Sequence, residues 1–262
     1  GMPRLMRVLP TNKISTQSKG SPTSYWQNLY EGYQFAFRSK YLRAFVVVSI
    51  FMMVLQALMQ FEILRYLNDY TNNATSDLVK DTFISGFFSN ILIWGSLLLL
   101  PFQLFAFTRL VAWAGVERVN LIFPVTSLLA SLALIVIPLR YADNLTATFS
   151  IAQINIVIII AILVIAEFNR TVLNIGIRAV NDEFLYNAVP VRVKGRIRGF
   201  ISGIVEPFGT FIVGAFLLIP AIVNTPIIIP GLLVVVSIGY LFASMWVSQQ
   251  YGRALISMIE EE

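Results

Sequence analysis

The residues of this chain that could do chemistry are few, and they lie inside or beside long apolar stretches. Glu62 and Arg65 are three residues apart, a spacing that puts both side chains on one face of a helix near the end of an apolar run. Glu206 lies about two helical turns inside another apolar run and is followed by Pro207, whose ring frees a backbone carbonyl in the preceding turn. Because a charge at the centre of a bilayer costs roughly 2.5 to 3.5 kcal/mol, each of these groups is a candidate for binding a solute or a coupling ion.

Each candidate also has a purely structural interpretation. Glu62 and Arg65 could form an end-of-helix ion pair that reaches water and contributes under about 1 kcal/mol. Glu206 could pair with an arginine of a neighbouring helix, and neutral polar residues could join helices by hydrogen bonds instead of lining a permeation path. The candidates for substrate binding or ion coupling are Gln60, Glu62, Arg65, Asn90, Gln103, Asn155 and Glu206.

A second set of charged residues falls between the apolar runs and predicts a role at the cytoplasmic membrane surface. Glu167 and Arg170 are expected at the cytoplasmic end of the fourth run, where Glu167 pairs with a basic residue of the loop that follows. The candidates for gating or for binding anionic lipid are Arg109, Arg118, Glu167, Arg170, Arg192, Lys194, Arg196 and Arg198. Cations beside a membrane attract anionic lipid at about 1 kcal/mol each, and an anionic solute is the alternative ligand.

The elements that position these residues are predicted to be membrane-spanning helices. Hydrophobic residues make up 57% of the 262 residues and charged residues 13%, whereas a soluble domain carries about 25% charge. A spanning helix needs about 20 predominantly apolar residues, and the chain supplies six such runs. We therefore expect an all-α membrane protein with spans at about 41–67, 82–108, 119–139, 147–169, 199–219 and 227–247.

The distribution of Lys and Arg predicts the orientation, because cationic loops stay in the cytoplasm. Only Arg65, Lys80 and Arg140 fall on the side opposite to the other cations. Both ends are therefore expected in the cytoplasm, most simply of a bacterial inner membrane. Outside the spans we expect a polar tail or linker over 1–23, an amphipathic interfacial helix over 24–38 and a cytoplasmic tail over 248–262.

Composition also argues against several classes of function. The chain has no Cys and no His, which removes thiol nucleophiles, the commonest metal ligand and the usual general base. We expect no enzyme, no metal site and no cofactor. The net charge of +5 is spread between apolar runs and not gathered on one water-facing surface, so nucleic acid is not an expected partner.

Two connections between the runs resemble known sequences. Residues 108–118 read TRLVAWAGVER and resemble a worn loop signature of the major facilitator superfamily, which keeps an Arg, a Gly and another basic residue; the conserved acid of that signature is missing. Residues 185–209, with LYNAVP, a basic run and GFISGIVEPFG, are similar to the second half of ATP/ADP-antiporter-like proteins, the nucleotide-transporter branch of the superfamily. Residues 39–43, SKYLR, resemble the start of that family's seventh helix, so the likeness covers roughly 25–251.

The resemblance implies half of a carrier. Members of the superfamily have two six-helix halves, each built as two three-helix repeats, with the substrate near the midplane between the halves. We therefore expect a 3+3 half-bundle whose partners are the lipid bilayer, an anionic small-molecule solute and a second half, which is either a missing N-terminal half or another copy of the chain. Glu206 stands where nucleotide exchangers tend to carry a cation, which counts against ATP/ADP exchange. The rival prediction is a membrane anchor or sensor that retains the fold without transport.

Overall fold

The protein is a bundle of long helices, seen here in a computed structural model that describes residues 33–34, 37, 39–71, 77–143 and 149–260. Within these ranges the side chains of residues 77, 140–143, 149–156, 191–192, 255 and 257–260 are not described. The described residues are almost entirely helical, at 95%. The elements are α2 (Lys40–Thr71), α3 (Asp77–Pro101), η1 (Phe102–Phe107), α4 (Thr108–Ala114), α5 (Val116–Asp143), α6 (Phe149–Phe168), η3 (Asn169–Arg178), α7 (Ala179–Leu185), η4 (Tyr186–Ala188), α8 (Val191–Phe200), η5 (Ile201–Val205), α9 (Glu206–Leu217), α10 (Pro220–Val223) and α11 (Ile228–Glu260).

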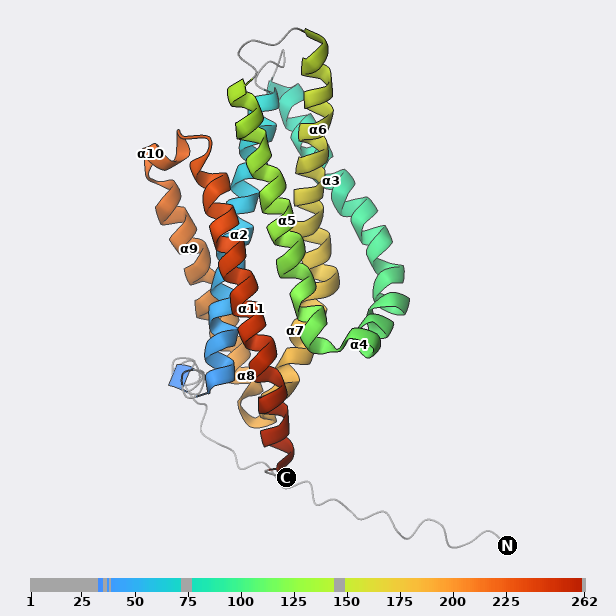
Figure 1. Cartoon of the computed structure of the whole chain (residues 1–262), viewed down its shortest axis with the longest axis vertical. Helices are drawn as coiled ribbons and strands as arrows, with labels where there is room; N and C mark the ends of the chain where they lie inside the picture. The colour runs from blue at the N-terminus through green and yellow to red at the C-terminus, as the bar shows by residue number, and fades with distance from the viewer. Residues whose placement is uncertain (1–32, 35–36, 38, 72–76, 144–148, 261–262) are drawn as a thin grey trace, which may run out of the picture.

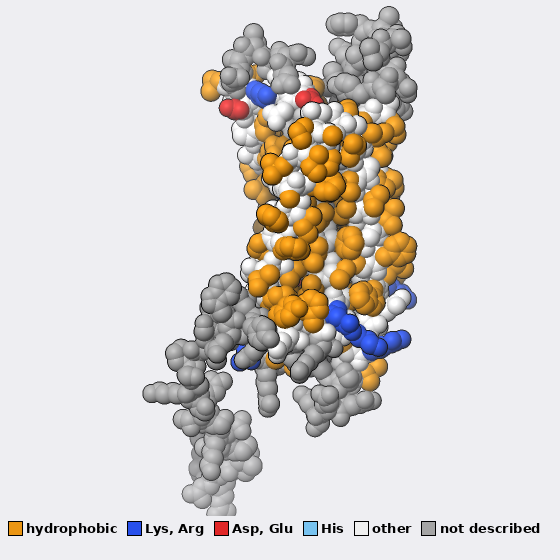
Figure 2. All heavy atoms as spheres, turned by 90° about the vertical axis from the view of Figure 1, so that its left-hand side faces the viewer, with side chains coloured by type: hydrophobic (Ala, Val, Ile, Leu, Met, Phe, Trp, Pro, Cys, Tyr) orange, Lys and Arg blue, Asp and Glu red, His pale blue; other side chains and the backbone are white. Residues whose placement is uncertain are grey.

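In the part of the chain that the structure describes, six helical stretches are long and apolar enough to cross a membrane, which confirms the predicted number of spans. They are Lys40–Thr71, Leu78–Ala114, Val116–Leu139, Val157–Ala188, Val193–Leu217 and Ile228–Ala254. Hydrophobic side chains cover the middle of the molecule in Figure 2, and most of the charged side chains drawn there lie at its two ends. This distribution matches a hydrocarbon layer between two aqueous surfaces, and it indicates an integral membrane protein.

The helices pack around α2 and α11 (Figure 1). One side of α2 contacts α11 and α9, while α11 also lies against α5. The outer flank is made by α6 and η3, which pack on α5 and carry α3 on their far side. We call the end at which α2 begins the inner end and the opposite end the outer end. The core between these helices is aliphatic and aromatic, with Met52, Leu58, Leu134 and Tyr240 buried.

Glycine allows the closest helix contacts. A Cβ atom on Gly209 of α9 would lie 2.8 Å from Met53 Cβ of α2, and one on Gly239 of α11 would lie 2.6 Å from Phe51 Cε1. Gly95 of α3 meets Val172 of η3 in the same way. By contrast Gly214, in the same span as Gly209, has nothing within 4 Å of its Cβ position. Close helix packing therefore accounts for Gly209 of the fifth span but not for Gly214.

The fourth and fifth helices differ from the spans expected from sequence. The fourth continues past Asn169, its expected end, through η3 and α7 to Leu185, and the fifth begins at Val191 instead of 199. Two ion pairs inside the helix, Glu167 with Arg170 and Arg178 with Asp182, explain the first difference. A charged residue that is paired on its own helix does not have to end a span, because the pair is close to neutral.

Most of the amphipathic helix expected over 24–38 lies outside the described residues. Of that segment Tyr33 and Phe37 are described, and their rings lie 4.6 Å apart. The Tyr33 ring also meets the edge of Phe200, at the end of α8, with 5.9 Å between ring centroids. The predicted tail over 1–23 lies wholly outside the described residues.

Candidate functional site

The outer pair joins Glu62 and Arg65 on α2 to the turn before α11. Arg65 Nη2 lies 2.7 Å from Glu62 Oε1 and also donates to the Pro226 carbonyl at 3.0 Å. The Glu62 side chain is fully buried, and that of Arg65 is 15% exposed. Because the guanidinium holds both a carboxylate of its own helix and the backbone of a distant turn, the pair ties the outer end of α2 to the α10–α11 connection. This geometry favours the structural interpretation of the pair.

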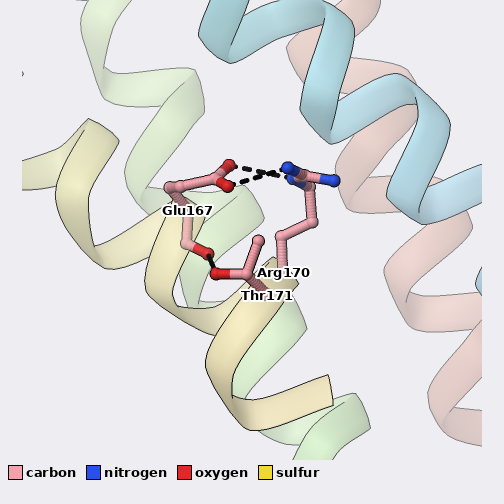
Figure 3. A network of polar contacts seen from close by, with 3 residues as sticks. All are labelled: Glu167, Arg170 and Thr171. Atoms are coloured by element: carbon pink, nitrogen blue, oxygen red, sulfur yellow. Dashed lines mark hydrogen bonds and ion pairs between the residues drawn. The ribbon is translucent and has the colours of Figure 1, made fainter. Parts of the chain in front are cut away.

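The second pair joins Glu167, at the end of α6, to Arg170, in η3 (Figure 3). Arg170 Nε donates to Glu167 Oε2 at 2.8 Å and Nη2 donates to Oε1 at 2.7 Å, so the contact is bidentate. The Glu167 side chain is 3% exposed and the Arg170 side chain 17%. Thr171 donates to the Glu167 backbone carbonyl and not to its carboxylate. Among the residues with described side chains, Arg170 is therefore the partner of the carboxylate. A bidentate pair of this kind is strong and geometrically specific.

Neighbouring contacts place this pair near the middle of the bundle. Asn169 Nδ2 donates to Ser127 Oγ of α5 at 2.9 Å. Ser127 lies one turn from Ser131, and both are close to the midpoint of α5, which runs from Val116 to Asp143. Glu167 and Arg170 are thus at mid-depth of the bundle, whereas the sequence predicted a position at the cytoplasmic end of the fourth span. A charged pair at mid-depth is a stronger candidate for a functional site than one at a helix end.

A third pair lies further toward the inner end. Arg178 Nη2 contacts Asp182 Oδ2 at 3.0 Å, with side chains 12% and 19% exposed. The Arg178 guanidinium lies close to the Tyr240 hydroxyl of α11, and Glu206 lies near enough to Arg178 and Asp182 for its charge to act on both. Glu206 therefore lies near an inner polar cluster formed around Arg178 and Asp182.

Amides and hydroxyls extend this cluster between three helices. Asn181 of α7 donates to Asn120 Oδ1 of α5 at 3.1 Å. The Asn120 amide in turn donates to the Ser244 carbonyl at 3.2 Å and to Ser248 Oγ at 3.1 Å, both in α11. Ser248 completes the chain by donating to the Glu117 carbonyl at 3.0 Å. These bonds hold α5, α7 and α11 together near the inner end.

The remaining candidates are dispersed. Gln103 donates weakly, at 3.4 Å, to the Ile175 carbonyl and links η1 with η3, whereas Asn90 bonds within its own helix to the Gly86 carbonyl. Gln60 is exposed on α2, and Arg109, Arg118 and Arg196 are exposed near the inner end. Lys194 donates to Asn187 Oδ1 at 3.1 Å. Asn155 and Arg192 lie in helices, but their side chains are outside the described set.

The basic run expected in a loop is instead part of α8. Arg198 pairs with Glu183 of α7, and both side chains are about half exposed. The Arg198 guanidinium also lies 5.2 Å from the Tyr186 ring centroid. The run therefore closes the turn between the fourth and fifth helices, in addition to any role at the membrane surface.

Sequence reasoning missed several members of the inner cluster as site residues: Arg178, Asp182, Tyr240, Asn120, Asn181, Ser244 and Ser248. The signal for one pair was present, because Arg178 and Asp182 have the four-residue spacing of a helical ion pair. The contacts of Asn120 with Asn181 and Ser248 span 61 and 128 residues, and no local pattern predicts them.

Together the fold and the site indicate an integral membrane protein of six apolar helices with a bidentate charged pair at mid-depth. Comparison of the chain with protein-family models, with curated proteins and with solved structures found no match.

Proposed function

We propose that the chain is one six-helix half of a major-facilitator-type carrier that moves an anionic solute by alternating access. The packing pattern is the observation that carries the proposal. Spans one to three, α2, α3 and α5, form the first triplet, and spans four to six, α6–η3, α9 and α11, form the second. The first helix of the first triplet, α2, packs on α9 and α11, the second and third helices of the second triplet. Likewise α6–η3 packs on α3 and α5, the second and third helices of the first triplet. Since α2 begins at the inner end and α6 at the outer end, exchanging the triplets inverts the bundle (Figure 1), as an inverted repeat requires.

The third helices of the two triplets, α5 and α11, support the same relationship. They meet where Ser131 of α5 and Ser237 of α11 bond, with 2.7 Å between the hydroxyl oxygens. Each serine follows a buried proline by seven residues, Pro124 in α5 and Pro230 in α11. Because α5 and α11 run in opposite directions, the prolines lie on opposite sides of the crossing. A two-fold axis through the serine pair would exchange them.

Arg170 is the proposed solute-binding residue. Among the described side chains it is the cation at mid-depth, where carriers of this architecture hold their substrates. Its guanidinium presents the fork geometry that carboxylate and phosphate groups match. The second half of the carrier would come from an N-terminal extension or from another copy of the chain.

Uptake into proteoliposomes tests the proposal. Purified protein is reconstituted and assayed with labelled ATP, ADP and inorganic phosphate as probes. We expect saturable uptake of at least one probe and its loss in Arg170→Gln, while Arg198→Gln, which opens a half-exposed pair, retains it. Protein that moves none of the three probes, or moves them equally well in Arg170→Gln, would contradict the proposal.

The second candidate function is a membrane anchor or sensor without transport. The observation that favours it is the apolar character of the outward faces, including Trp94 and Leu98 of α3 and Phe211 of α9. Removing residues 2–23 separates the two functions. A sensor would lose recruitment of its partner in this variant while Glu206→Gln and Arg65→Gln had no effect on any activity, whereas a carrier would keep its uptake.

A further inference from the structure

We infer that Glu167 and the anionic solute compete for Arg170, so that the solute binds together with a proton. The inference rests on the proposed function, because it assigns the coupling ion of the same site. It predicts a proton–anion symporter.

The geometry makes the competition direct. Glu167 occupies the Nε and Nη2 edge of the Arg170 guanidinium at 2.8 and 2.7 Å. This edge is one of the two-donor edges that bind a carboxylate or phosphate in bidentate form. An anion that takes this edge therefore has to displace Glu167. The Glu167 side chain is 3% exposed, so its carboxylate lies away from the molecular surface.

Charge balance then requires a proton. The pair is neutral as it stands, and adding a singly charged anion would leave one uncompensated negative charge at mid-depth, which is costly. Protonation of one Glu167 carboxyl oxygen removes its charge and weakens its bonds to Arg170, which stays cationic. The freed donors bind the anion, and the site is neutral again. Release of the anion lets the carboxylate lose its proton and bind Arg170 once more.

Neighbouring charges do not supply a substitute for the proton. The charged residues of α2 within the outer half, Glu62 and Arg65, pair with each other. Toward the inner end Arg178 is held by Asp182. At the level of the pair α5 contributes the Ser127 hydroxyl, through Asn169, and α3 contributes the apolar contacts of Gly95 and Leu99 with η3.

Buried polar atoms without a partner lie along the helix between the inner end and this pair. Four atoms along η3 and α7 are buried without a hydrogen-bond partner among the described residues: Asn169 Oδ1, Asn174 Oδ1, Arg178 Nε and Asn181 Oδ1. The π-helical winding of η3 contributes to this alignment, because residues four and five apart come round to one face when the bonds run from i to i+5. Buried polar atoms of this kind are satisfied by water, and linked waters would carry the proton from the inner surface to Glu167.

Binding measured against pH tests the inference. The full chain in lipid nanodiscs is titrated between pH 5 and pH 9 with dimethyl phosphate and with methanesulfonate, two anions that stay singly charged over this range. For the wild type we expect affinity to rise by up to about tenfold for each unit by which pH falls, since one linked proton sets that slope. Glu167→Gln, which mimics the protonated acid, should bind tightly at every pH. The control Glu183→Gln, in the half-exposed pair with Arg198, should follow the wild type.

A second measurement uses the unaltered protein. In weakly buffered solution, binding should take up about one proton per anion, read with a pH indicator dye. Binding that is independent of pH and takes up no proton would overturn the coupling and leave the carrier proposal standing. Failure of the wild type and of Glu167→Gln to bind either probe at any pH would overturn both, and persistence of binding in Arg170→Gln would overturn the assignment of the site.

Discussion

The Ser131 hydroxyl of α5 and the Ser237 hydroxyl of α11 bond across the middle of the bundle, with 2.7 Å between their oxygens and both side chains fully buried. Ser131 also donates to the Ser127 carbonyl at 2.8 Å, so Ser237 is the donor to Ser131. This bond fixes the register of the two third helices at the point where the proposed two-fold axis passes.

Replacing one of the two serines should lower the unfolding free energy by more than half of the loss caused by replacing both. In Ser131→Ala the Ser237 hydroxyl loses its acceptor, and we expect a loss of about 0.6 to 1 kcal/mol in unfolding free energy, in the range of hydrogen bonds between membrane helices. The double variant, which leaves no hydroxyl unpaired, should be less destabilised than the sum of the single variants. Unfolding in mixed detergent micelles measures all three. Strict additivity would show that the two hydroxyls do not interact.

Gly209 and Gly214 form a matched pair for testing the contact of α9 with α2. A Cβ at Gly209 would meet Met53 Cβ at 2.8 Å, whereas one at Gly214 meets nothing within 4 Å. Gly209→Ala should therefore destabilise the protein by about 1 to 3 kcal/mol through overpacking. Gly214→Ala should be neutral or stabilising by a few tenths of a kcal/mol, because alanine favours helix. Thermal denaturation in detergent compares the variants, and equal effects would contradict the packing of these two helices.

The pair of Arg178 with Asp182 should be far more sensitive than that of Arg198 with Glu183. Removing one partner of a buried pair leaves an uncompensated charge, so Arg178→Gln and Asp182→Asn should each cost about 3 to 5 kcal/mol. The double variant Arg178→Met with Asp182→Leu should recover most of the loss. Arg198→Gln serves as the control, because its pair is half exposed and worth under about 1 kcal/mol. Single variants as stable as the control would place Arg178 in water.

Sequence predicted the number of helices well and their limits less well. Charge-free runs locate hydrophobic helices because an unpaired charge is excluded from hydrocarbon. The same criterion ended the fourth charge-free run at Ala166 and the predicted span soon after, at Asn169, although Glu167 pairs with Arg170 on the same helix and the helix continues to Leu185. Counting two oppositely charged residues three or four apart as one neutral pair would have extended the predicted fourth span.

The site was less predictable than the fold. Glu167 and Arg170 were recognised as a candidate, but their depth depends on where the helix ends and on the Asn169 bond to Ser127, 42 residues earlier in the chain. For the outer pair, spacing predicted the contact of Glu62 with Arg65, while the bond to the Pro226 carbonyl, 161 residues away, required the structure. Local spacing thus predicts contacts within a helix and not what surrounds them.

Sidedness can be measured cleanly because the chain has no Cys. A single cysteine at Asn187, exposed at the inner end, should react in intact cells only with a membrane-permeant maleimide. One at Asn224, exposed in the turn at the outer end, should react with an impermeant maleimide. The bias of cations toward the inner end underlies the expectation. The opposite labelling pattern would invert the orientation, and reaction of both sites with the impermeant reagent would contradict the spans between them.

The depth of the Glu167–Arg170 pair is the point on which the account depends, and spin-label accessibility measures it most directly. A nitroxide at Ile165, 57% exposed and two residues from Glu167, is compared in bilayers with one at Trp113, 85% exposed near the inner end. We predict that Ile165 shows high collision rates with oxygen and low rates with a water-soluble nickel chelate, as at the bilayer centre, while Trp113 shows the pattern of the interface. Equal access of the nickel chelate to both positions would place the pair at the membrane surface and contradict the account.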